Sequence, residues 1–167
     1  MKNNLSYTKS VRSLVYGALT AAMYVVLTYL TGLMGLASGV IQFRISEALC
    51  VLPIFFPAAI PGLFIGCLIS NLITGCLPWD VVFGSVATLI GAIGAYLMRK
   101  IPERIKILAT LPTVLANAII VPIVLIKVYG ATDSYPFILL TVSIGEIVCA
   151  TILGTVLYYA LKKTKKF

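Results

Sequence analysis

The fold is decided by residues 45–75, ISEALCVLPIFFPAAIPGLFIGCLISNLITG, which contain one charged residue, Glu47. As a single α-helix this stretch would be about 46 Å long at 1.5 Å per residue. The hydrocarbon core of a bilayer is only about 30 Å thick, so one straight helix does not fit. Pro57, Pro61 and Gly62 predict a turn within the stretch. We therefore expect two short spans that are kinked, partly buried in protein or incompletely crossing.

The composition places the whole chain in a membrane. Of its 167 residues, 60% are apolar and 11% charged, and its mean hydropathy is +1.07. The apolar runs are continuous and longer than the roughly 10-residue alternating segments of a membrane β-barrel. The sequence therefore predicts an all-α integral membrane protein with one domain over residues 1–167. Its first span is expected to be retained rather than removed as a signal peptide.

Hydropathy and helix-breaking residues predict six transmembrane helices, at 11–32, 44–57, 60–75, 81–98, 107–127 and 138–161. With a cytoplasmic N-terminus, eleven of the thirteen lysines and arginines lie on the cytoplasmic side, and only Arg44 and Lys127 lie outside. Five spans would put the basic loop 99–106 outside, against the positive-inside rule. We therefore expect a multi-pass plasma-membrane protein with both termini in the cytoplasm.

The charge and the cysteines exclude two classes of partner. The net charge is +8, but the basic residues lie in short connections and tails rather than on a face with interleaved aromatics. They fit lipid headgroups, and we expect no nucleic-acid partner. The four cysteines show no C-x-x-C spacing and the chain has no histidine, so we expect no metal site and no cofactor.

Three of the five acidic residues, Glu47, Asp80 and Glu146, lie inside or at the lip of predicted spans. A carboxylate in hydrocarbon costs several kcal/mol, so such residues mark ligand or ion sites by default. The predicted orientation puts all three in the outer half of the membrane. Further polar and aromatic residues reach the same depth, and they are Gln42, Phe43, Arg44, Asn71 and Trp79. Together they predict a small-molecule pocket that opens to the outside.

The charged residues also have structural alternatives. Arg44 and Glu47 stand three residues apart, as in a local ion pair. Asp80 directly precedes an apolar helix and fits an N-cap. Glu146 fits a buried pair with a distant Arg or Lys, because unpaired burial would force its protonation.

The aromatic and amide residues are equally open to two interpretations. Trp79 fits the interfacial aromatic belt, but it also fits a stacking surface for a heteroaromatic ligand. Asn71 and Asn117 fit hydrogen bonds across helices, which is the commoner use of Asn in membranes. We assign no site role to Lys127 or Asp133.

Small residues form two narrow helix faces. Ala18 and Ala22 make an A-x-x-x-A pair in the first span. The third span repeats small residues every four positions, at Gly62, Gly66, Ser70 and Thr74. Such faces allow close helix contact. We expect the third-span face to pack internally. For the first-span face, contact with another membrane subunit is the alternative.

An outward pocket in a small membrane protein indicates import. The chain has no G-x-x-x-x-G-K-[ST] motif, so it cannot use ATP through a P-loop. It has no histidine, no zincin motif and no G-x-S-x-G elbow, so we do not expect an enzyme. Its energy source lies in another subunit, unless it works alone as a proton-coupled carrier with Glu47 and Glu146 as coupling groups.

Three segments carry a resemblance to a known family, namely IQFRISEAL at 41–49 with Leu52-Pro53 following, GCLISN at 66–71 and PWDVVFGS at 78–85. They resemble the QueT family of queuosine-precursor transporters, which are S components of energy-coupling factor (ECF) importers. Span count and orientation match over nearly the whole chain, whereas the distinctive motifs lie between residues 41 and 88. The resemblance implies a six-helix, ECF S-component-like bundle with a lid formed by the loop 33–43.

The resemblance also implies partners and a substrate. The partners are a membrane scaffold subunit, contacted by the Ala18 and Ala22 face, and two cytoplasmic ATPases. The substrate is a 7-deazaguanine such as 7-aminomethyl-7-deazaguanine. Its guanine edge presents two N–H donors that one carboxylate can accept, with Glu47 as first choice. An S component for another vitamin-like cation is the alternative.

Each remaining site residue has an implied role toward that substrate. Glu146 or Asp80 would pair with the ammonium of the aminomethyl arm. Phe43 or Trp79 would cover the ring face. The carbonyl oxygen would be met by a neighbouring donor from Gln42, Arg44 or Asn71.

Overall fold

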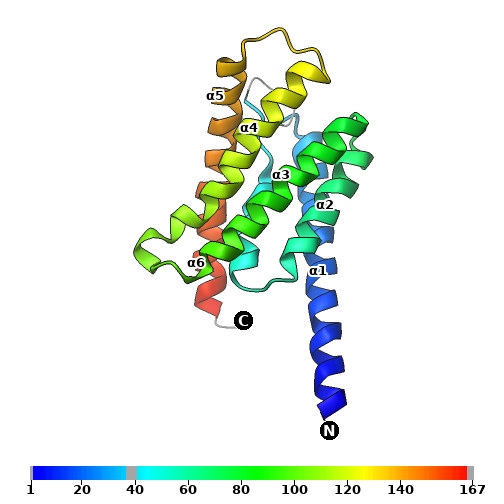
Figure 1. The fold of residues 1–167 in the computed structure, drawn as a ribbon, viewed down its shortest axis with the longest axis vertical. Helices are drawn as coiled ribbons and strands as arrows, with labels where there is room; N and C mark the ends of the chain where they lie inside the picture. The colour runs from blue at the N-terminus through cyan, green and yellow to red at the C-terminus, as the bar shows by residue number, and fades with distance from the viewer. Residues whose placement is uncertain (1, 37–40, 165–167) are drawn as a thin grey trace.

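The computed structural model describes residues 2–36 and 41–164, and this part of the chain contains helices and no strand (Figure 1). Four helical stretches are long and apolar enough to cross a membrane, and they are Ser10–Leu33, Pro78–Lys100, Glu103–Lys127 and Tyr135–Thr164. The predicted fold class, an all-α membrane protein, is confirmed. Part of the loop 33–43, at residues 37–40, lies outside the described residues.

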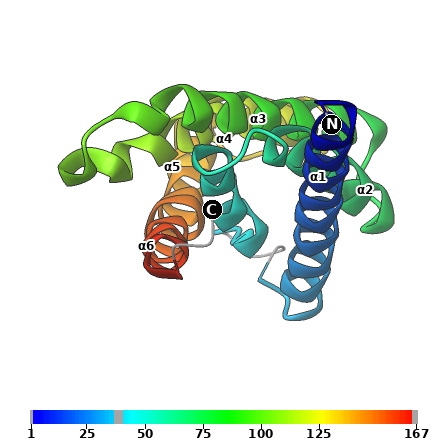
Figure 2. The same ribbon diagram turned by 90° about the horizontal axis from the view of Figure 1, so that it is seen from below.

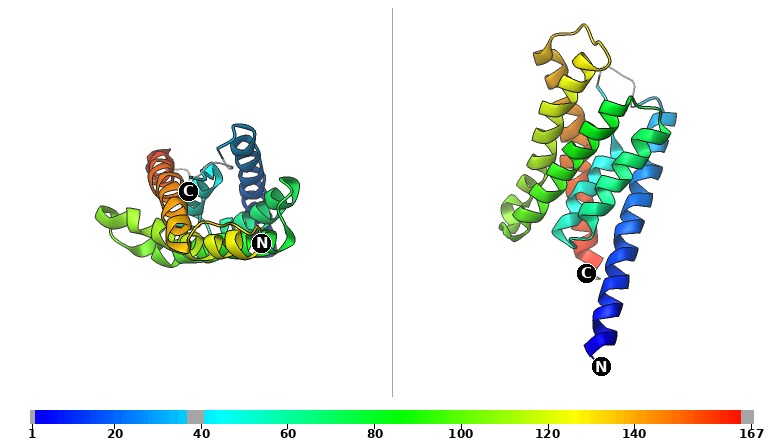
Figure 3. Two further views of the ribbon diagram at one scale, coloured as in Figure 1. Left: turned by 90° about the horizontal axis from the view of Figure 1, so that it is seen from above. Right: turned by 45° about the vertical axis from the view of Figure 1, so that its right-hand side comes forward.

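The long helices coincide with the first, fourth, fifth and sixth predicted spans. In chain order their elements are α1 (Lys2–Leu33), α3 (Pro78–Leu97), η2 (Met98–Lys100), η3 (Glu103–Thr110), α4 (Leu111–Lys127), α5 (Tyr135–Glu146), η4 (Ile147–Leu153) and α6 (Gly154–Thr164). The sixth span is therefore not one regular helix, because η4 is a π-helix between two α-helical parts. The first part of α1 extends beyond the other helices (Figures 1 and 3).

Residues 45–75 form two separate elements, as their length requires. The first is η1 (Ile45–Ile54), a 3₁₀ helix, and the second is α2 (Ala59–Ile73). The break between them contains Pro57, whereas Pro61 and Gly62 lie inside α2, so these two residues do not make the turn that the sequence assigns to them. At about 2.0 Å per residue η1 is roughly 20 Å long, and α2 is roughly 22 Å long at 1.5 Å per residue. Both are shorter than a bilayer core.

The element η1 lies in the middle of the molecule. Helices that follow one another, from α1 through α2, α3 and α4 to α5, pack side by side and form a curved layer (Figures 2 and 3). Inside this curve, η1 contacts α1, α3, α6 and η4. Eight of its ten residues are buried. Protein rather than lipid thus surrounds its backbone, as a short irregular segment at membrane depth requires.

Glycines on α2 allow α1 to pack closely against it. A Cβ atom added to Gly62 would lie 2.5 Å from the carbonyl oxygen of Gly17, and one added to Gly66 would lie 2.9 Å from that of Ala21. These distances leave no room for a side chain. The internal packing expected for this third-span face is therefore confirmed for Gly62 and Gly66.

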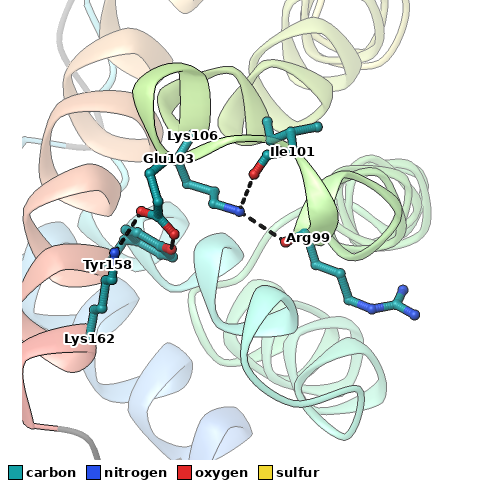
Figure 4. A network of polar contacts seen from close by, with 6 residues as sticks. All are labelled: Arg99, Ile101, Glu103, Lys106, Tyr158 and Lys162. Atoms are coloured by element: carbon teal, nitrogen blue, oxygen red, sulfur yellow. Dashed lines mark hydrogen bonds and ion pairs between the residues drawn. The ribbon is translucent and has the colours of Figure 1, made fainter.

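A polar network joins the connection between α3 and α4 to the C-terminal helix α6 (Figure 4). The Lys106 ammonium donates to the carbonyl oxygens of Arg99 at 2.9 Å and Ile101 at 2.7 Å. Glu103 accepts a hydrogen bond from the Tyr158 hydroxyl at 2.9 Å and forms an ion pair with Lys162 at 2.9 Å. The network fixes the short η2 and η3 segments at this end of the bundle.

The two halves of this network should contribute unequally to stability. Lys106 is 6% exposed, so Lys106→Met would leave two partly buried carbonyl groups without their donor and destabilise the protein by about 1–3 kcal/mol. Glu103→Gln should cost less than about 1 kcal/mol, because both ion-pair partners are half exposed. Thermal unfolding in detergent checks this order, and a larger loss for Glu103→Gln would contradict it.

Candidate functional site

A cavity of about 540 Å³ lies at the end of the molecule opposite the two termini. Its volume falls within the range of small-molecule sites. The cavity is lined by residues of α1, α2, α3 and α4, of the connections that follow α2 and α4, and of the segment before η1. They are Thr28, Thr31, Gly32, Gln42, Arg44, Asn71, Thr74, Gly75, Cys76, Asp80, Val121, Leu125 and Tyr129. Four of the predicted site residues are therefore part of the lining, namely Gln42, Arg44, Asn71 and Asp80.

Three of these side chains converge above Gly84 of α3. A Cβ atom at Gly84 would lie 3.1 Å from Asn71 Nδ2, 3.5 Å from Asp80 Oδ1 and 4.0 Å from Arg44 Nη1. Asn71 and Asp80 are almost fully buried within the protein. An amide, a carboxylate and a guanidinium from three different segments thus meet at one point, which Gly84 leaves open.

Tyr129 fixes the carboxylate of Asp80. Its hydroxyl donates to Asp80 Oδ2 at 2.9 Å and accepts a hydrogen bond from the backbone N–H of Leu77 at 3.1 Å. Burial, together with the bond to Asp80, raises the pKa of Tyr129 to about 12, so it keeps its proton at neutral pH and remains a donor. The N-cap alternative for Asp80 is wrong, because Leu77 is the N-cap of α3 and no side chain caps it.

Tyr129 is not among the site residues that the sequence patterns predict. It follows the fifth span directly, and its contact with Asp80 joins residues 49 positions apart. The signal available in the sequence was an aromatic residue with a polar tip at the predicted depth of the pocket.

Glu47 lies behind the cavity lining, in the centre of the bundle. It is 1% exposed and accepts hydrogen bonds from the hydroxyl of Tyr24, from Cys50 Sγ at 3.1 Å and from Thr88 Oγ1 at 3.3 Å. The predicted local ion pair with Arg44 does not form, because the single ion pair among the described residues joins Lys162 and Glu103. Helix contacts rather than a local charge pair therefore hold this acid.

Glu146 is also buried, at 6% exposure, and does not line the cavity. Its predicted ion pair with a distant base is likewise absent from the described residues. Nearby, a Cβ atom at Gly145 would overlap the carbonyl oxygen of Gln42. The segment before η1 therefore lies directly on α5, and this contact places Gln42 and Arg44 at the cavity.

The two predicted aromatic residues lie outside the lining. Trp79 is 59% exposed and stacks on Phe83 with the ring centroids 6.0 Å apart, as suits the aromatic belt at a membrane surface. Phe43 is half-buried, and its backbone N–H donates to the carbonyl oxygen of Leu36 at 3.0 Å. The structure thus brings the polar residues together without these two aromatic rings.

The close contact at Gly145 leads to a test of how the segment before η1 is held. Gly145→Ala should push this segment away from α5 and expose Cys149, which is buried and lies near the Arg44 backbone. Maleimide labelling of the folded protein, read by mass spectrometry, should then modify Cys149 in addition to the half-buried Cys76. Gly154→Ala is the matched control, since its added Cβ meets Ala48 at an ordinary 3.4 Å. Unchanged protection of Cys149 in Gly145→Ala would contradict the contact.

A bundle of membrane-length helices with a cavity at one end, lined by apolar and a few polar side chains, is typical of membrane proteins that bind a small molecule. Comparison with known families agrees, because the model of the family described as QueT transporter matches residues 14–163. The chain therefore belongs to the QueT transporter family. A family of transporters agrees with the prediction that the protein is not an enzyme.

One relative is the queuosine precursor transporter QueT of Lactococcus lactis subsp. cremoris (strain MG1363). It is 42% identical over 74 residues, which cover 44% of this chain. The match spans 43% of the relative's own length. No solved structure matches the chain.

Proposed function

We propose that the protein is the S component of an ECF importer and that its cavity binds a 7-deazaguanine such as 7-aminomethyl-7-deazaguanine. The family and the name of the Lactococcus lactis relative support a queuosine precursor as the class of substrate. A cavity of about 540 Å³ suits a bicyclic base with a short arm.

The observation that carries this proposal is an excess of acid around the cavity. Asp80 lines it, and Glu47 and Glu146 lie behind the lining. Arg44 is the one cation among the lining residues, and it lies within electrostatic range of all three acids. An excess of carboxylates in an apolar setting favours a positively charged ligand. The aminomethyl arm supplies such a charge, whereas a nitrile in its place does not.

The lining residues suggest how the substrate is held. Asp80 Oδ1 lies near Gly84 beside Asn71, while Oδ2 is bonded to Tyr129, so we assign Oδ1 as the oxygen available to an ammonium group. Donors of Arg44, Asn71 and Gln42 are placed to meet the carbonyl oxygen of the base. Glu47 could bind the guanine edge only if the N–H groups of the ligand replaced the hydrogen-bond donors that now surround the Glu47 carboxylate. Stacking by Phe43 or Trp79 remains a prediction.

The groove between α1 and α2 supports the proposed partner. It has a volume of about 910 Å³ and is lined by small and apolar side chains, among them Ala18 and Ala22. Both alanines are exposed. Small side chains on an exposed membrane helix allow another helix to approach closely. We assign this face to the ECF scaffold subunit, which two cytoplasmic ATPases would drive. Both termini would then lie in the cytoplasm, and the cavity would open to the outside of the plasma membrane.

Asp80→Asn should weaken binding of 7-aminomethyl-7-deazaguanine about ten- to hundredfold, as loss of a hydrogen bond to a charged group implies. The nitrile analogue should lose less, because it lacks the ammonium. Calorimetry on the purified protein measures both ligands, with guanine and thiamine as competitors. Asp133→Asn is the control, since it removes one exposed acid of the α4–α5 connection. Equal losses for amine and nitrile would contradict the assigned contact, and preference for thiamine would favour another vitamin-like cation.

The double variant Ala18→Leu, Ala22→Leu should abolish cellular uptake and leave binding by the purified protein intact, because it fills the groove and not the cavity. Val15→Leu, which changes an exposed position off the groove, is the control. Uptake that persists in the double variant would count against the partner surface. Transport by the purified chain in liposomes without ATPases would favour a stand-alone carrier.

A further inference from the structure

Glu146 is the one acid in the described chain with a buried carboxylate oxygen that lacks a hydrogen-bond partner. The residue is 6% exposed and ends α5, in the part of the chain that is long and apolar enough to cross a membrane. The π-helix η4 follows it directly. Such π-helical turns occur frequently at functional sites. A buried acid with one oxygen that lacks a hydrogen-bond partner, next to such a turn, needs a physical explanation.

The groups around Glu146 do not supply a counter-charge of its own. Glu47 and Cys50 face it from η1, Arg44 from the segment before η1, and Cys149 from η4. On the α4 side, the uncharged amide of Asn117 lies near the Glu146 carboxyl group, but neither its nitrogen nor Glu146 Oε2 has a partner at hydrogen-bond geometry. No lysine or arginine of the described chain forms an ion pair with Glu146.

Arg44 cannot neutralise every acid near it. Its charge acts on Asp80 and Glu47 as well as on Glu146, so one guanidinium faces three carboxyl groups. Glu47 has three hydrogen-bond donors, and Asp80 has the hydroxyl of Tyr129. An ionised carboxylate without such support is very costly in a low-dielectric interior, and protonation removes that cost. Of the three acids, Glu146 is therefore the one whose protonation disrupts the fewest hydrogen bonds to a carboxylate.

We propose that Glu146 is a proton-binding site and that the ligand-free protein holds this proton at neutral pH. The two remaining carboxylates and the Arg44 guanidinium then leave one net negative charge at the cavity. One negative charge matches a ligand with one positive charge. This consequence for the substrate rests on the proposed function, whereas the bound proton does not.

Infrared spectroscopy of the ligand-free protein tests the proton directly, because the carbonyl stretch of a protonated carboxyl group is separate from the bands of a carboxylate. At neutral pH the wild type should show this band and should shift it in heavy water. Glu146→Gln should lose the band, and Glu47→Gln and Asp133→Asn should keep it. Absence of the band from the wild type, or its persistence in Glu146→Gln, would overturn the proposal.

Thermal unfolding gives a second, independent reading. Glutamine reproduces the size and neutral charge of a protonated glutamate, so Glu146→Gln should fold and be at least as thermostable as the wild type at neutral pH. A variant that fails to fold, or that unfolds at a clearly lower temperature, would overturn the proposal. Failure of the wild type to bind 7-aminomethyl-7-deazaguanine, with the carboxyl band present, would instead count against the proposed function and leave the proton site standing.

Discussion

The hydrogen bonds to the carboxylate of Glu47 are the interaction around which the bundle is arranged. Their donors come from Tyr24 of α1, Thr88 of α3 and Cys50 of η1 itself. A buried acid is tolerated only where such donors surround it. The short η1 segment must therefore lie between α1 and α3, and the long helices curve around it (Figure 2). One polar side chain in the sequence thus constrains the packing of three elements.

Glycine shapes the site by what it leaves out. At Gly84, the missing side chain leaves open the point where Asn71, Asp80 and Arg44 converge. At Gly145, it allows the backbone at Gln42 to lie directly on α5. Both residues lie on helices, where glycine costs about 1 kcal/mol relative to alanine. The close approach of polar groups to these helices offsets that cost. The two glycines therefore determine both where the cavity lies and where its polar lining groups meet.

The sequence predicts the membrane class, the long helices and the break near Pro57, because hydropathy, length and helix-breaking residues act locally. It also predicts that four of the residues that line the cavity lie at one depth in the membrane. Local patterns say nothing about which way a side chain turns, and the buried Glu47 and the exposed Trp79 illustrate this limit. Glu47 turns toward Tyr24 and Thr88 behind the lining, and Trp79 turns outward onto Phe83. Tyr129 escapes prediction because its partner is distant in the chain.

The shortness of α2 has a consequence for the surrounding lipid. Outside the groove between α1 and α2, this helix exposes Leu72 and Ile73 to the surrounding membrane. It is roughly 22 Å long, against a hydrocarbon core of roughly 30 Å. A bilayer that meets a short helix thins locally, at a modest cost for each ångström of mismatch. The membrane beside α2 is therefore expected to dip toward the cavity. Water and solutes then approach the cavity across less hydrocarbon than a full-length helix would impose, and the thickness of the bilayer becomes a variable to which the protein responds.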